Sequence, residues 1–109
     1  MVATLSLVTK DDILTFLSQH KAALEKAGIG KIGLYGSFAK DTADIYSDID
    51  IAIQLKKNYL SEHDAWDYFT LIDHIKTLLS KKFTRKCDVL DLDSDSFIIN
   101  TIKDEIIYV

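Results

Sequence analysis

The sequence contains no proline, a single cysteine and only four glycines among its 109 residues. Without proline, a Gly/Ser-rich linker or an internal repeat, there is no point at which to place a domain boundary. We therefore expect one domain over residues 1–109. The lone Cys87 excludes a disulfide within the chain and is most simply a small buried hydrophobic residue.

Long apolar runs and excess positive charge are also missing. No stretch approaches the roughly 20 apolar residues of a membrane-spanning helix, and the first eight residues lack the pattern of a secretion signal. We therefore expect a cytoplasmic protein with no membrane partner. Asp and Glu number 17 against 13 Lys and Arg, a formal net charge of −4. This balance argues against a surface built to grip nucleic acid, so direct nucleic-acid binding is not expected.

Hydrophobic periodicity divides the chain into helices and strands. A helix is predicted from Thr9, which forms a capping box with Asp12, to Gly28. Short apolar or alternating runs predict strands at residues 31–35, 48–54 and 87–92. A short terminal helix capped by Ser94 or Asp95 should be followed by a β-prone end at residues 106–109.

A second long helix is predicted to begin with a capping box of Ser61 and Asp64 and to run to about Ser80. Its apolar residues recur at helical spacing and are expected to pack mainly in the core. These residues are Ala65, Trp66, Phe69, Ile72, Ile75, Leu78 and Leu79. A partner-facing role for Trp66 and Tyr68 is the less favoured alternative.

A basic segment follows that helix, with four of residues 81–86 being Lys or Arg. Cations are favoured near a helix C-terminus by the helix dipole, which explains much of this composition. The alternative is that one or two of these side chains reach a triphosphate or a negatively charged partner.

Gly36 and Ser37 follow the first predicted strand directly. Glycine lets the backbone approach a ligand without an intervening side chain. A helix that starts at Ser37 would direct unpaired N–H groups toward an anion such as a phosphate, and Lys40 would reinforce that preference. These three residues are therefore candidates for binding a phosphate group.

Asp48 and Asp50 alternate with isoleucines along the second predicted strand. Alternation places both carboxylates on one face, roughly 6.5 to 7 Å apart at Cα. Both could reach one hard cation, and Mg²⁺ prefers such oxygen ligands together with substrate phosphates. The alternative is a solvated acidic face, since Asp-x-Asp also occurs from Asp91 to Asp95.

The pattern of Gly36-Ser37, ten residues and then Asp48-Ile49-Asp50 resembles the minimal nucleotidyltransferase family of the DNA polymerase β superfamily. The resemblance continues through the strand at residues 87–92 to the C-terminus. It implies an α/β fold with a polymerase β-like core, in which a small mixed sheet carries helices mainly on one face. It also selects Asp88, rather than Asp91, as the third carboxylate, and strand parity puts these two on opposite faces.

The resemblance further implies an activity. Asp48, Asp50 and Asp88 would be catalytic and would hold two Mg²⁺ ions, while Gly36, Ser37 and Lys40 would bind the phosphates of ATP. Asp88 would accept the proton of an attacking hydroxyl, and AMP would be transferred to that hydroxyl with release of pyrophosphate.

Proteins of this size in the family resemble antitoxins that transfer AMP to a tyrosine of a partner HEPN-domain RNase toxin, so a hetero-oligomer with such a toxin is expected. This chain has Lys40-Asp41 where the family often has Arg-Gly, which loses the bidentate guanidinium and adds a negative charge. Two alternatives remain: a catalytically weak or silent antitoxin that acts by binding, and an adenylyltransferase for a small molecule.

Overall fold

The computed structural model describes residues 7–109; the first six residues of the stretch searched for a secretion signal lie outside that part. The elements follow the order α1 (Lys10–Ala27), β1 (Ile29–Tyr35), α2 (Gly36–Ala39), β2 (Ile49–Leu55), α3 (Tyr59–Glu62), α4 (Ala65–Phe83), β3 (Cys87–Asp91), α5 (Ile98–Ile102) and β4 (Ile107–Tyr108). The strands form one sheet in the order β3-β2-β1-β4. No helix in residues 7–109 is long and apolar enough to cross a membrane.

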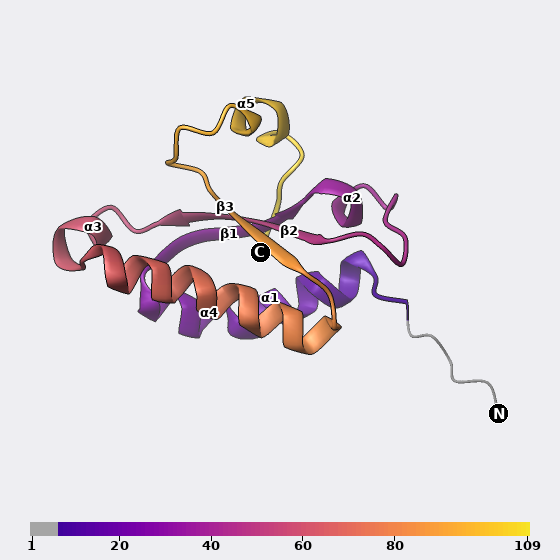
Figure 1. Cartoon of the computed structure of the whole chain (residues 1–109), viewed down its shortest axis with the longest axis horizontal. Helices are drawn as coiled ribbons and strands as arrows, with labels where there is room; N and C mark the ends of the chain where they lie inside the picture. Colours follow the sequence, from indigo (N-terminus) through magenta and orange to yellow (C-terminus); the bar gives the residue numbers. More distant parts are fainter. Residues whose placement is uncertain (1–6) are drawn as a thin grey trace.

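The sheet is mixed and its two faces are covered unequally. Strand β2 runs parallel to β3 and antiparallel to β1, and β4 pairs antiparallel with β1. The long helices α1 and α4 lie together on one face, while the short α5 and its flanking loops lie on the other (Figure 1). This arrangement confirms the predicted α/β fold with helices mainly on one face.

Helix α1 has the ends that the sequence predicted. The Thr9 hydroxyl accepts a hydrogen bond from the Asp12 N–H at 3.1 Å, and the Asp12 carboxylate accepts one from the Thr9 N–H at 3.0 Å. Gly28, with φ of 119°, ends the helix in the left-handed region that favours glycine. The predicted capping box is therefore confirmed.

The predicted start of α4 was wrong by one turn. The N-cap is Asp64, which forms a capping box with Asp67. Ser61 belongs instead to the separate short helix α3, where its hydroxyl donates to the Asn58 carbonyl at 2.9 Å. The extended backbone of His63 separates the two helices. Ser61, Asp64 and Asp67 are spaced by three residues, so Asp64 can form a capping box with either neighbour. The helix uses the pair Asp64 and Asp67.

The predicted apolar stripe of α4 is also only partly correct. Leu71, Ile75 and Leu79 are buried, but Trp66 and Phe69 are 78% and 65% exposed. Residues spaced by four along a helix share one face, and the stripe that reaches the sheet is set by these three. Trp66 and Phe69 lie on the side of the helix turned away from it and form an exposed aromatic surface.

The core divides along the alternation of β2. Ile49, Ile51 and Ile53 are fully buried in the large cluster shared with α1 and α4. On the opposite face Ala52 belongs to a small cluster with Tyr35 and Ile102. The isoleucine face of β2 therefore anchors the sheet on the helices and leaves Asp50 on the face of α5.

The C-terminal region contains the predicted short helix and strand, but the helix lacks the predicted cap. The β-prone end forms β4, which pairs Tyr108 with Gly33 and Ile107 with Leu34. Helix α5 begins after Phe97, and its first turn has no side-chain cap from Ser94 or Asp95. The predicted cap was therefore wrong.

Tyr68 of α4 ties the helix layer to β3, because its hydroxyl donates to the Asp91 carboxylate at 2.8 Å. Burial, the hydrogen bond and the charge of Asp91 raise the pKa of Tyr68 to about 12. We expect Tyr68→Phe to lower the free energy of unfolding by about 1 to 2 kcal/mol, since it leaves one oxygen of the Asp91 carboxylate without its donor, while the other oxygen keeps the Asp93 N–H at 2.9 Å. Urea unfolding measures this loss. The same change at the exposed Tyr46 should cost almost nothing, and equal effects would contradict the assignment.

Candidate active site

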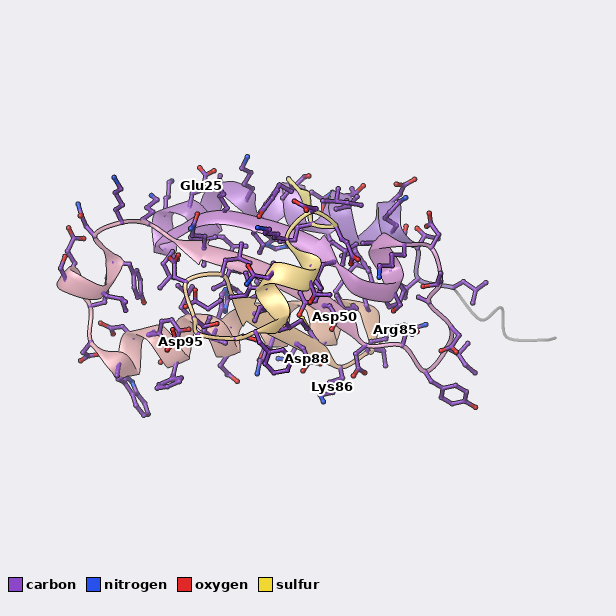
Figure 2. All side chains as sticks on the ribbon, turned by 90° about the horizontal axis from the view of Figure 1, so that it is seen from above. Glu25, Asp50, Arg85, Lys86, Asp88 and Asp95 are labelled. Atoms are coloured by element: carbon purple, nitrogen blue, oxygen red, sulfur yellow. The ribbon has the colours of Figure 1, made fainter. Side chains whose placement is uncertain are left out.

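The pairing of β2 with β3 brings two of the predicted carboxylates together. The parallel register sets Asp50 against Asp88, and the antiparallel register with β1 sets Tyr35 against Asp50. Directly paired residues on neighbouring strands project to the same face. Seen from the side of α5, Asp50 and Asp88 lie in the same region, with Lys86 and Arg85 beside them (Figure 2).

Strand parity separates Asp88 from Asp91 as the alternation predicted. Asp91 projects toward the helix layer and accepts the hydrogen bond of Tyr68. Asp88 lies on the opposite face with Leu90, which packs against the small cluster under α5. Asp48 precedes β2 by one residue and lies two residues before Asp50. The sheet therefore brings Asp88, not Asp91, to the Asp48 and Asp50 pair.

The electrostatics of this group are those of crowded negative charge. Burial, followed by the charges of Asp88 and Asp48, raises the pKa of Asp50. Burial and the charges of Asp50 and Asp88 likewise raise the pKa of Tyr35 to about 12. Among the ion pairs within residues 7–109, only one involves these three carboxylates. In that pair, Nζ of Lys86 lies 3.8 Å from an Asp88 oxygen. This face therefore favours an added cation.

The donor set suits a hard divalent cation. Three carboxylates on two adjacent strand ends are the oxygen ligands that Mg²⁺ takes alongside phosphate, and their mutual repulsion is what a cation would relieve. In residues 7–109, however, no group of three or more Asp, Glu, His or Cys side chains is arranged so that it could hold a metal ion. The residues fit Mg²⁺ by chemistry and position, and the site is not preassembled.

Gly36 allows the turn after β1 to approach these carboxylates. Its φ is 77°, in the left-handed region, and a Cβ at this position would overlap the Asp50 carboxylate, with Cγ only 3.0 Å away. Ser37, the next residue, is half-buried, and its carbonyl accepts a hydrogen bond from the Thr42 N–H at 2.9 Å. The Gly-Ser turn and Asp50 therefore form one packed unit.

Lys40 has a partner that the sequence did not suggest. Its Nζ lies 3.2 Å from Oε1 of Glu105 in the segment before β4, and Oε2 of Glu105 is buried without a hydrogen-bond partner. Asp41 adopts a φ of 59°, in the left-handed region that glycine adopts more easily. Its charge is offset by Lys10 at 3.0 Å.

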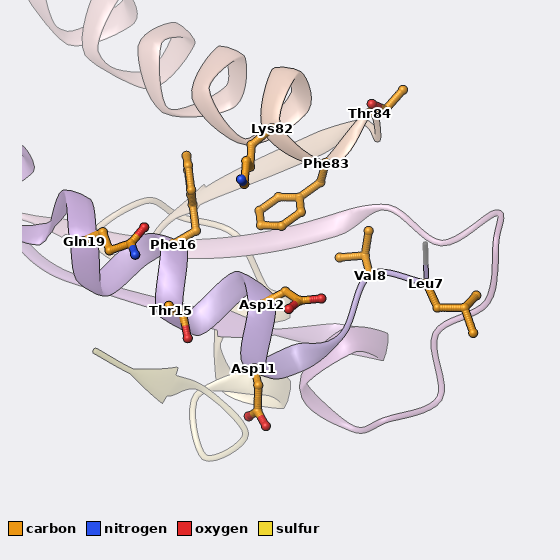
Figure 3. Close-up of a pocket in the computed structure, with 10 residues that line it drawn as sticks. All are labelled: Leu7, Val8, Asp11, Asp12, Thr15, Phe16, Gln19, Lys82, Phe83 and Thr84. Atoms are coloured by element: carbon orange, nitrogen blue, oxygen red, sulfur yellow. The ribbon is translucent and has the colours of Figure 1, made fainter. Parts of the chain in front are cut away.

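A cavity of about 630 Å³ lies elsewhere, between the start of α1 and the end of α4 (Figure 3). It is lined by Leu7, Val8, Asp11, Asp12, Thr15, Phe16, Gln19, Lys82, Phe83 and Thr84. None of the three carboxylates, and neither residue of the Gly-Ser turn, borders it. The cluster of carboxylates on the α5 face can bind a cation and a phosphate, and the residues around this cavity offer no such chemistry. We therefore place the candidate site at the carboxylates.

Carboxylates on adjacent strands of a small mixed sheet, packed against a Gly-Ser turn, are suited to hold a divalent cation beside a phosphate group. The chain matches the family model described as polymerase beta, nucleotidyltransferase, over residues 13–109, and it belongs to that family.

Individual proteins are similar to this chain in sequence or in fold. The chain is 28% identical over 104 residues to a Methanocaldococcus jannaschii protein named as a protein adenylyltransferase, covering 93% of this chain and 98% of that protein. A crystal structure titled as a toxin–antitoxin with AMP-PNP has the same fold, with a TM-score of 0.51 and 23% identity. The match covers 84% of this chain and 64% of the other. A second toxin–antitoxin structure, titled MntA-HpeT, matches with a TM-score of 0.47 and 17% identity, covering 90% of this chain and 78% of the other.

Gly36→Ala tests the packing of the turn. We expect it to lower the free energy of unfolding by about 1 to 3 kcal/mol, because alanine is strained at this φ and its methyl group would displace Asp50. Urea unfolding provides the measurement. Gly30→Ala is the control, since Gly30 has no positive φ and its Cβ would meet the Gln54 and Leu55 carbonyl oxygens only at 3.2 and 3.3 Å. Equal losses would show that the contact with Asp50 is unimportant.

Asp50→Asn tests the repulsion among the carboxylates. Without divalent cations, we expect its melting temperature to rise by a few degrees, because the change keeps the shape and removes one of three like charges. Added Mg²⁺ should raise the melting temperature of the wild type and leave the variant unchanged. Asp73→Asn, an exposed site on α4, should behave as the wild type. A variant less stable than the wild type in the absence of cations would refute the repulsion.

Proposed function

We propose that this protein transfers AMP from ATP to a hydroxyl group, specifically a tyrosine, of a partner HEPN-domain RNase toxin. The observation that carries the proposal is the parallel register that sets Asp50 beside Asp88, next to Asp48 and the Gly36 turn. Family membership and the name of the Methanocaldococcus relative support nucleotidyl transfer to a protein.

In the proposed reaction the acceptor hydroxyl attacks the α-phosphorus of ATP, and the bond to the leaving pyrophosphate breaks. Asp88 takes the proton of the attacking hydroxyl. Gly36 keeps the turn close to the phosphates, where the Ser37 hydroxyl and neighbouring N–H groups donate hydrogen bonds. Two Mg²⁺ ions held by Asp48, Asp50 and Asp88 would supply charge stabilisation of the phosphates when bound.

A protein acceptor is favoured by the surface around the site. The loop between α2 and β2, which leads to Asp48, carries exposed Ile45 and Tyr46. Exposed aromatic groups of this kind are enriched where proteins contact each other. The similar structure of a toxin–antitoxin with AMP-PNP suggests a toxin as that partner, and the HEPN class follows from the family resemblance.

A binding-only antitoxin is the second candidate. It is favoured by two observations, namely that the carboxylates do not converge as they stand and that Lys40 is held by Glu105. In this case the protein would neutralise its partner by covering it, without ATP.

One experiment separates the two candidates. The protein is incubated with ATP labelled at the α-phosphate, Mg²⁺ and the product of the neighbouring gene, and transferred label is measured. Asp88→Asn should reduce transfer by about 10² to 10⁴ through loss of proton abstraction, and further if cation binding is lost. Partner binding should persist, because the change is isosteric.

Asp91→Asn is the matched control, because this carboxylate faces the helix layer and should leave transfer nearly intact. If Asp91→Asn abolished transfer and Asp88→Asn did not, the assignment of the two carboxylates would be reversed. If neither change mattered and the partner were neutralised without ATP, the protein would be a binding module.

A further inference from the structure

Arg85, in the turn between α4 and β3, contacts two other segments at once, the loop between α2 and β2 and the helix α2. Its Nη1 donates hydrogen bonds to the Asp44 carbonyl at 2.9 Å and to the Ser47 carbonyl at 3.0 Å. Its guanidinium lies 5.0 Å from the centre of the Phe38 ring in α2. These contacts explain why Arg85 is only partly exposed although it belongs to a basic surface segment.

Each contacted segment leads directly into a part of the candidate site. Ser47 precedes Asp48, Phe38 follows Ser37, and Arg85 itself lies three residues before Asp88. The main chain reinforces the same junction, because the Ile49 N–H donates to the Lys86 carbonyl at 2.9 Å. One guanidinium therefore joins the entries of β2 and β3 to the Gly-Ser turn.

The loop is folded so that it presents its carbonyls to Arg85. The Asp44 carboxylate accepts a hydrogen bond from the Tyr46 N–H at 2.8 Å, and the Asp44 N–H donates to the Ser47 hydroxyl at 2.9 Å. This closed turn brings the Asp44 and Ser47 carbonyls to the same nitrogen. A lysine ammonium could bond the carbonyls, but it lacks the planar group that stacks on an aromatic ring.

We propose that Arg85 is a positioning residue that holds Asp48 in place beside Asp50 and Asp88. Three carboxylates repel one another, so the loop that carries Asp48 needs an attachment to stay near the other two. Arg85 supplies that attachment through neutral carbonyls, which leaves the carboxylates free for a cation. The inference deepens the proposed function and rests on it for its catalytic consequence.

The experiment compares Arg85→Lys and Arg85→Met with wild type and with Lys81→Met, an exposed change in the same basic segment. Hydrogen exchange should rise by about 10-fold or more in residues 44–49 of both Arg85 variants, and remain unchanged in α1 and α4. Mn²⁺ affinity, measured by electron paramagnetic resonance without ATP, should fall by about 10-fold, as for other losses of residues that orient ligands. Lys81→Met should match the wild type in both measurements.

The outcomes are distinct. Unchanged exchange and unchanged Mn²⁺ affinity in both variants, or a wild type that does not bind Mn²⁺, would overturn the inference. Unchanged exchange with a higher KM for ATP alone would also overturn it and would make Arg85 a phosphate ligand. A wild type that binds Mn²⁺ but transfers no label would refute the proposed function, while the loss of Mn²⁺ affinity in Arg85→Lys would still support the positioning role.

Discussion

The parallel pairing of β2 with β3 is the constraint on which the candidate site depends. Side chains alternate between the faces of a strand, so a slip of one residue in this pairing would carry Asp88 to the helix face. The register is fixed from the other side of the sheet, where Ile49, Ile51 and Ile53 are fully buried under α1 and α4. The hydrophobic core thus determines which carboxylate stands beside Asp50.

The same pairing imposes a cost, since it holds like charges together on a partly buried surface. The raised pKa of Asp50 reflects that cost. The surrounding contacts hold the carboxylates in place without neutralising their charge. Gly36 fits against the Asp50 carboxylate because it has no side chain, and Arg85 bonds carbonyls rather than carboxylates. The fold therefore stabilises the arrangement while preserving the charge that a divalent cation would need.

Most elements of the fold, though not the short helix α3, and the parity of its strands could be predicted from the sequence, because both follow from local periodicity. The capping box of Thr9 with Asp12 and the opposite faces of Asp88 and Asp91 are examples. The start of α4 could not be resolved, since Asp64 can either close a box with Ser61 or open one with Asp67. The exposure of Trp66 and Phe69 could not be resolved either, because the sequence does not show that the face with Leu71, Ile75 and Leu79 is the one that reaches the sheet.

Contacts between distant segments gave no local signal. Arg85 meets Asp44 and Ser47 about forty positions away in the chain, and within the sequence it is one of four similar charges. Tyr35 could have been placed opposite Asp50 only if the register of the antiparallel pair had been known. The pairing of Lys40 with Glu105 likewise depends on where the segment before β4 returns to the sheet.

The pair of Lys40 and Glu105 connects two segments on the α5 face of the sheet. Glu105 follows α5 and precedes β4, and Lys40 ends α2, so their contact joins the C-terminal segment to the Gly-Ser turn. If Lys40 binds phosphate, its ammonium either leaves Glu105 or contacts both groups, since it has three N–H donors. One oxygen of Glu105 is buried without a partner, although the side chain as a whole is 33% exposed. Loss of Lys40 would leave this carboxylate without its cation, which is unfavourable unless water or another donor replaces it. The pair therefore links phosphate binding at the Gly-Ser turn to the segment before β4.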